Sequence, residues 1–149
     1  MHELTLFAPR AEFGKPFLPL TCGDTFLIPK SARETEHLWI IVTEIDAITK
    51  KAVCVNVTTR QNHSDTTLVL QVGDHAFLKH ESVVNYSDAR EMPINLVEQA
   101  LQNRTTQFVC QLRDPCSATL LKRIQQGLIA SKQTPKDIKA RCKNLWGIK

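Results

Sequence analysis

Short apolar segments separated by turn-forming residues fill the middle of the chain, and they predict β-strands. The first is Thr25–Ile28, which follows the turn-prone pair Gly23-Asp24. It stops at Pro29, which has no N–H to donate to a strand ladder. Residues 1–21 before it mix prolines with apolar residues in neither the helical nor the strand period, so we expect an irregular arm there.

The strongest strand signals are residues 38–43 and 52–58. The first segment is almost wholly β-branched or aromatic, and this pattern is typical of a strand buried on both faces. The second repeats the pattern after a link at residues 44–51. Because that link is short, we expect the two strands to pair as a hairpin.

Three further segments complete the predicted β region. Residues 66–72 place Leu68 and Leu70 on one strand face, and residues 77–80 and 82–86 follow after the turn pair Gly73-Asp74. Five or six short strands with no helix between them predict a small antiparallel barrel or curled sheet.

The period of the pattern changes after residue 90 and predicts helices. Pro93 suits the first position of a helix that runs to about Asn103, whereas residues 106–112 fit either a short strand or an extended link. Ser117 is a suitable cap for a second helix, and Thr134-Pro135 predicts the start of a third. The apolar stripes of these two helices are Leu120, Leu121, Ile124 and Leu128, and Ile138, Cys142, Leu145 and Trp146.

The whole pattern predicts an α+β protein with an antiparallel β-barrel or curled sheet followed by C-terminal helices. With 149 residues we expect one domain: an arm at 1–21, a β region at 22–90 and a helical tail at 91–149. No apolar run approaches the roughly 18 residues needed to span a bilayer, and the N-terminus lacks a secretory pattern. We therefore expect a cytoplasmic protein that does not bind membranes.

The cysteines and the charge narrow the chemistry further. Five cysteines with no Cys-x-x-Cys pair favour free buried thiols over a disulfide framework or a zinc site. We expect no metal and no cofactor, since even His75 and His80 with a cysteine match no common zinc spacing. Residues 117–149 contain eight Lys or Arg and one acid, a net charge of +7 in a chain whose total is +4. Such a tail fits a nucleic acid, an acidic protein partner, or merely a solvated helix face.

Side chains that can move protons or bind phosphate gather around the ends of the predicted strands, where scaffolds usually present functional groups. They are Arg33, His37, Thr58, Thr59, Arg60, His75, Lys79, His80 and Ser82. Cleavage of RNA without a metal needs a base for the ribose 2′-hydroxyl, an acid for the leaving oxygen, and donors that stabilise the phosphorane. Histidine suits both proton roles, and Arg or Thr suits the third.

Each of these residues also has a simpler interpretation. His37 can end a strand with its ring in solvent, and His75 can be a turn residue bonded to nearby backbone. Thr58 and Thr59 have high strand propensity whatever their function. In a regular strand His80 would lie on the opposite face from His75.

The order of these segments resembles the MazF/PemK family of toxins, whose small SH3-like barrels cleave single-stranded RNA. The resemblance covers about residues 21–92 and starts with Gly23-Asp24 ahead of the first strand. The third strand ends in Thr58-Thr59 where the family has a Thr-Ser pair. Residues 82–86 with Asp88-Ala89-Arg90 resemble the last barrel strand and the segment after it.

The resemblance implies an endoribonuclease toxin of a toxin–antitoxin-like system, an SH3-like barrel, a homodimer and an antitoxin partner. It implies a catalytic arginine before the second strand and a catalytic threonine at the end of the third, where this chain has Thr58. At the arginine position the chain has His37-Leu38 in place of Arg-Pro. The cation must then come from Arg33 or Arg60, or His37 itself becomes an acid or base.

Three hypotheses follow. The first is a ribonuclease with His37, Thr58 and His80 as catalytic residues and RNA contacts from the other six residues, Arg33, Thr59, Arg60, His75, Lys79 and Ser82. The second is a non-catalytic SH3-like module that binds nucleic acid or a protein partner. The third is a regulator whose helical tail occupies a groove on another protein.

Overall fold

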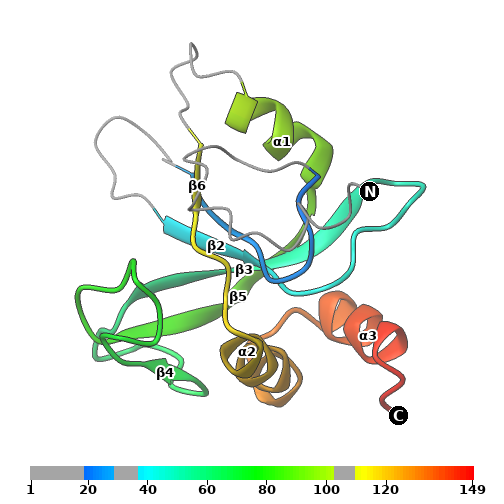
Figure 1. Cartoon of the computed structure of the whole chain (residues 1–149). Coiled ribbons are helices and arrows are strands. Elements are labelled where there is room, and N and C mark those ends of the chain that lie inside the picture. The colour runs from blue at the N-terminus through cyan, green and yellow to red at the C-terminus, as the bar shows by residue number, and fades with distance from the viewer. Residues whose placement is uncertain (1–18, 29–36, 103–109) are drawn as a thin grey trace.

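The computed structural model describes residues 19–28, 37–102 and 110–149, and in this part the chain forms a six-stranded antiparallel curled half-barrel followed by C-terminal helices (Figure 1). The predicted α+β class is therefore confirmed. In sheet order the strands are β4 (Val69–Leu70), β5 (Ser82–Pro93), β3 (Lys51–Thr59), β2 (His37–Ile41), β1 (Thr25–Ile28) and β6 (Gln111–Arg113). The helices are α1 (Ile94–Gln102), α2 (Ala118–Ala130) and α3 (Lys136–Leu145).

The predicted hairpin of β2 and β3 is confirmed, with Leu38 opposite Val57 and Ile41 opposite Cys54. Asp46 closes the link between them, because its Oδ1 accepts hydrogen bonds from the N–H groups of Ile48 and Thr49, each at 2.8 Å. A short polar side chain that binds backbone two or three residues ahead is a common way to fix such a turn.

Strand β5 is longer than the predicted strand at 82–86, and a wide irregularity divides it. Asn56 of β3 pairs with Asn85, whereas Cys54 pairs with Arg90. One residue of β3 therefore faces four residues of β5, and such a bulge bends a strand strongly. The bend contributes to the curl of the sheet and turns residues 87–93 into a second strand segment.

One face of the sheet packs against α2 and α3 (Figure 1). The tail is thus part of the core, with Leu120, Ile124 and Leu128 of α2 and Ile138 and Cys142 of α3 buried against the strands. The strand residues of this core are Leu27, Leu38, Ile40, Val53, Val55, Val57, Leu70, Val84, Tyr86 and Ala89. The opposite face packs against α1 through Phe26, Trp39, Ile41, Ala52 and Cys54.

Several details differ from the sequence-based expectations. The strand expected at residues 66–72 is limited to Val69–Leu70, and Pro93 ends β5 while α1 begins at Ile94. Residues 77–80 are not a strand, because His75 closes a turn there: its Nδ1 accepts from Phe77 N–H and its carbonyl accepts from Leu78 N–H. Thr134 does not cap α3, because its hydroxyl donates to Leu128 O and Pro135 occupies the cap position. Leu145 is 49% exposed and does not share the burial of Ile138 and Cys142.

Ser117 caps α2 as predicted, accepting a hydrogen bond from Leu120 N–H at 3.1 Å. Within the three described ranges, no helix is long and apolar enough to cross a membrane.

Candidate functional site at one end of the sheet

The register of the sheet brings His37 and Thr58 together. Leu38 pairs with Val57 at this end of the β2–β3 ladder, and His37 and Thr58 are the next residues of the two strands, each two positions from the paired Trp39 and Asn56. The two side chains then share one sheet face, because residues two positions apart along a strand project to the same side. Both residues are half-buried. This row lies on the α1 side of the sheet, at the end away from α1.

Beside that row, Arg60 is engaged by an acid. Its Nη1 donates to Glu81 Oε1 at 2.8 Å, and Gln71 Nε2 donates to Glu81 Oε2 at 3.2 Å. These hydrogen bonds, that from Arg60 first, hold the pKa of Glu81 below its ordinary value. The carboxylate therefore stays charged at neutral pH and offsets the positive charge of Arg60.

The β5 side of the same sheet end carries the remaining polar residues. Thr59 pairs with Ser82, so both lie at this end, but Ser82 is buried and its hydroxyl donates to His80 O at 2.9 Å. Lys79 and His80 are exposed and lie beyond the strand ends. His80 is therefore separated from His37 by the width of β3.

His75 does not join this group. It is 7% exposed, and both ring nitrogens are used: Nδ1 accepts from Phe77 N–H, and Nε2 lies 2.6 Å from Asp114 O. Because Nδ1 accepts a hydrogen bond, Nε2 carries the ring hydrogen and donates a hydrogen bond to the Asp114 carbonyl. This ring joins the 71–78 turn to the segment before α2. The other expected contact, Arg33, lies outside the described residues.

A second polar row lies next to the first, and the sequence reasoning did not select it. Trp39 pairs with Asn56, and Asn56 pairs with Asn85 on its other side. This row is two residues along the strands from His37 and Thr58, about 7 Å away. Asn56 is a single polar residue within a run of apolar strand residues, and this break in the pattern was the available signal.

Asp88 and Arg90 extend this second row. Asn56 Nδ2 donates to Asp88 Oδ2 at 2.5 Å, and Arg90 forms an ion pair with Asp88 Oδ1. The Arg90 guanidinium also lies over the Trp39 ring, with its carbon 5.5 Å from the ring centroid. Asn56 is 2% exposed, and its Oδ1 has no hydrogen-bond partner among the described residues.

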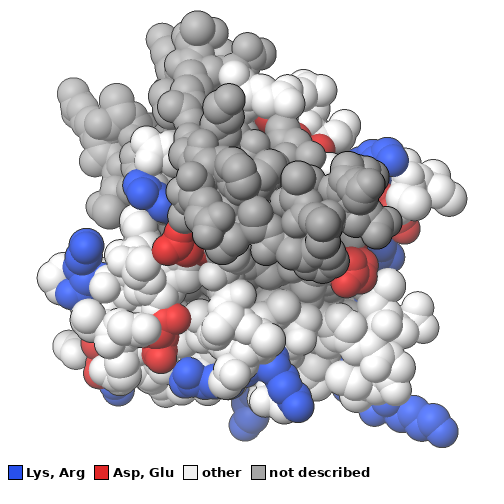
Figure 2. Space-filling model, viewed as in Figure 1, with Lys and Arg blue, Asp and Glu red and all other residues white. Residues whose placement is uncertain are grey.

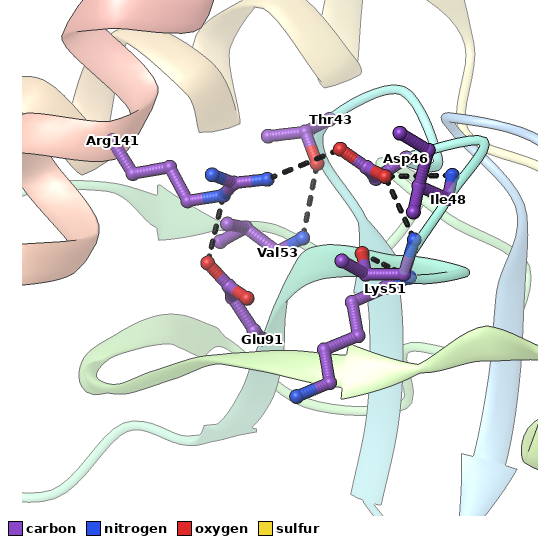
Figure 3. A network of polar contacts seen from close by, with 8 residues as sticks. Thr43, Asp46, Ile48, Lys51, Val53, Glu91 and Arg141 are labelled. Carbon is purple, nitrogen blue, oxygen red and sulfur yellow. Dashed lines mark hydrogen bonds and ion pairs between the residues drawn. The ribbon is translucent and has the colours of Figure 1, made fainter.

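The basic residues of the tail fall into two groups: arginines that pair with acids and lysines that are exposed. Figure 2 shows Lys and Arg side chains along the edge of the molecule where α2 and α3 lie. Arg123 approaches Asp74 at 3.7 Å, and Arg141 donates to Glu91 Oε1 at 2.7 Å and lies 3.9 Å from Asp46 (Figure 3). The arginines thus join the helices to acids of the sheet and its loops. Lysines such as Lys122, Lys132 and Lys136 are exposed.

The cysteines offer no reactive thiolate. All five are free, and burial raises the pKa of every thiol. The pKa of Cys22 rises to about 11 and that of Cys116 to about 12, for which burial is the main cause. Thiols of this kind are protonated at neutral pH and poorly nucleophilic. In the described part of the chain, no group of three or more His, Cys, Asp or Glu residues could hold a metal ion.

A comparison of the sequence with protein-family models gives no match, and a comparison with curated proteins gives none either. The resemblance to the MazF/PemK family therefore stays a prediction. The evidence for the candidate site is the arrangement of the residues described above.

Proposed function

We propose that this end of the sheet binds single-stranded RNA and cleaves it without a metal ion, in the manner of a ribonuclease toxin. The observation that supports the proposal is that His37 and Thr58 directly follow the Leu38–Val57 pair and continue the strand positions of Trp39 and Asn56 on one sheet face. A half-buried histidine retains contact with solvent and substrate, and its imidazole ring can accept or donate a proton.

In the proposed reaction, His37 accepts the proton of a ribose 2′-hydroxyl. The 2′-oxygen then forms a bond to phosphorus while the bond from phosphorus to the 5′-oxygen breaks, leaving a 2′,3′-cyclic phosphate. The departing 5′-oxygen takes a proton from His80 or from water. The Thr58 hydroxyl donates a hydrogen bond to a phosphate oxygen, where negative charge increases in the transition state.

A second candidate is binding of RNA without cleavage, and the Arg60–Glu81 pair favours it. A cation that already donates to a carboxylate stabilises a phosphorane less than a free one does. For Arg60 to serve in cleavage, RNA must exchange a phosphate oxygen for Glu81 Oε1, which lies 2.8 Å from its Nη1. Both side chains are nearly half exposed, so this exchange costs little.

The test is incubation of the purified chain with mixed RNA in EDTA, followed by mapping of the cut ends. We expect 2′,3′-cyclic phosphate ends, and a loss of roughly 10²- to 10⁴-fold in rate for His37→Ala. Thr58→Val keeps the strand shape and removes the hydroxyl, and it should also slow cleavage. His63→Ala is the matched control, because His63 is exposed in the loop after β3.

Two results would contradict cleavage. RNA that shifts in a salt-dependent way yet stays intact supports the binding module instead. Equal rates for His37→Ala and His63→Ala would contradict cleavage with His37 as the base. For the toxin role, induced expression should arrest growth and His37→Ala should relieve the arrest; normal growth at matched protein levels would exclude that role.

A further inference from the structure

The second polar row combines an accessible cation with a buried acceptor. The Arg90 side chain is 57% exposed, although one face of its guanidinium lies over Trp39. Its carboxylate partner Asp88 is 22% exposed, and Asn56 beneath it is 2% exposed. The row therefore runs from the surface inward, from a planar cation to a carboxylate and then to an amide.

The amide oxygen of Asn56 needs an explanation. Asn56 Nδ2 donates to Asp88, and this bond fixes the side chain with Oδ1 as the remaining acceptor. That oxygen is buried and has no partner among the described residues. Buried acceptors without a partner are uncommon in folded proteins, because they lose their bonds to water and gain none in return. An apolar residue would pack here more simply, as Val55 and Val57 do on either side.

The backbone at this point is also unusual. The strand irregularity that sets four residues of β5 against one of β3 contains Asp88 and ends at Arg90. Bulges of this kind redirect side chains and are frequent next to binding sites. Here the bulge directs Asp88 toward Asn56 and Arg90 toward Trp39.

From these observations we infer that Arg90, Asp88 and Asn56 form a subsite for a guanine base of the RNA, next to the His37–Thr58 row. Arginine guanidinium planes stack on bases in RNA recognition, and the Arg90 guanidinium already lies over the Trp39 ring. The acceptors beside it are the carboxylate of Asp88 and Oδ1 of Asn56. Guanine presents two adjacent donors on one edge, N1–H and the 2-amino group, and therefore complements two acceptors.

This inference rests on the proposed RNA binding and adds its base preference. The two rows lie about 7 Å apart along the strands, a spacing that allows one row to hold a base while the next holds a neighbouring phosphate. The subsite predicts cleavage beside guanine, and it predicts guanine-dependent binding even in a variant that cannot cut.

The experiment measures binding of short single-stranded RNAs to the full chain carrying His37→Ala, so that the RNA stays intact. Trp146→Phe is added, which leaves Trp39 as the single tryptophan and its fluorescence as the signal. The probes are one RNA with a central guanosine and the same RNA with inosine, which lacks only the 2-amino group. We expect inosine to weaken binding about tenfold.

Arg90→Gln in this background removes the plane on which the base stacks and also the ion pair that positions the Asp88 carboxylate. It should therefore weaken binding of the first RNA and remove the difference between guanosine and inosine. Arg113→Gln is the matched control, because Arg113 is also exposed and lies over an aromatic ring, that of Phe77 at 5.9 Å. It should keep the full preference for guanosine.

Each outcome separates this inference from the proposed function. Equal affinity for the two RNAs, or a preference unchanged by Arg90→Gln, overturns the guanine subsite while RNA binding stands. A guanine preference lost in Arg90→Gln supports the subsite even if the wild-type chain cuts no RNA. Absence of binding to either RNA overturns both.

Discussion

The two faces of the sheet are built from the same strands and differ in what their side chains do. Toward α2 and α3 the central strands β2 and β3 present Leu38, Ile40, Val53, Val55 and Val57, an apolar surface covered by Leu120, Ile124 and Leu128. Toward α1 the apolar surface stops partway, and Asn56, Thr58 and His37 continue it as polar rows. Since both faces alternate along one strand, polar residues on one side do not interrupt the core on the other. The fold can therefore maintain its stability on one face and tolerate reactive residues on the other.

This comparison predicts that the α2 face carries most of the stability. Ile124 is fully buried, and its replacement by alanine removes methylene contacts and leaves a cavity. We expect Ile124→Ala to lower the free energy of unfolding by about 3–4 kcal/mol. Denaturant unfolding measures the change, with the exposed Gln126→Ala on the same helix as a control that should stay within about 0.5 kcal/mol. A loss below about 1 kcal/mol for Ile124→Ala would contradict a stability role for this face.

The closest approach on that face is between Gly127 and Tyr86. A Cβ at position 127 would lie 2.1 Å from Tyr86 Oη and 2.8 Å from its Cζ. Tyr86 has little freedom to move, since it is fully buried and its hydroxyl donates to Ile124 O at 2.8 Å. Burial also raises the pKa of this phenol well above its ordinary range, so it remains a donor at any ordinary pH.

We expect Gly127→Ala to destabilise the protein by about 2 kcal/mol, despite the better helix propensity of alanine. Thermal or denaturant unfolding checks the value. Adding Tyr86→Phe removes the clashing hydroxyl and should cost less in the Gly127→Ala background than in the wild type. Additive losses would mean that the helix shifts away from the sheet rather than clashing with it.

The strands and helices of the α2 face could be predicted from the sequence, because the period of the apolar residues indicates which side of each element is buried. The stripe of Leu120, Ile124 and Leu128 predicted the buried side of α2, and residues 38–43 and 52–58 predicted the central strands. The second half of β5 escaped prediction, because Asp88, Arg90 and Glu91 show no alternation. Asp88 lies in the bulge, Arg90 contacts the Trp39 ring, and Glu91 pairs with Arg141 of α3. These contacts join residues that are distant in sequence.

The candidate site was less predictable than the fold, because its residues also depend on contacts that are distant in sequence. His37 and Thr58 could be proposed because each adjoins a strong strand signal, and both directly follow the paired residues Leu38 and Val57. Burial of His75 depends on the Asp114 carbonyl, which lies 39 residues away along the chain. A local sequence pattern cannot predict a contact between residues so far apart. Asn56 was visible as a polar residue in an apolar strand, but its link to Asp88 required the bulge.

The polar face should respond differently from the α2 face when its arginine is removed. Arg90→Gln leaves the apolar core intact and loses an exposed ion pair and a cation–π contact. We expect a loss of about 0.5–1 kcal/mol in stability, measured by denaturant unfolding. Arg113→Gln should cost a similar amount through its contact with Phe77. A loss near that of Ile124→Ala would show that the polar row supports the fold, and the contrast between the two faces would fail.

The smallest expected effect concerns Asp65, which links the loop after β3 to the end of α2. Burial raises the pKa of this carboxyl, but hydrogen bonds from the hydroxyls of Ser131 and Thr67 and from Thr67 N–H outweigh it and leave the pKa below its ordinary value. The Ser131 and Thr67 hydroxyls both donate at 2.6 Å. A carboxyl with a lowered pKa in the folded state stabilises the protein above the unfolded-state value of about 4, and the contribution is lost as pH falls through the folded-state pKa.

We therefore expect the stability difference between wild type and Asp65→Asn to shrink as the pH is lowered from about 6 to 3. The difference at pH 6 should be under about 1 kcal/mol, because Asp65 is only partly buried and solvent screens its charge. Urea unfolding at several pH values measures the difference. Ser131→Ala removes one of the donors to Asp65, so the stability of this variant should depend less on pH over the same range. Parallel loss of stability in the wild type and in Asp65→Asn would mean that the acid sensitivity arises elsewhere. The link between the loop after β3 and α2 would then rest on contacts of uncharged groups.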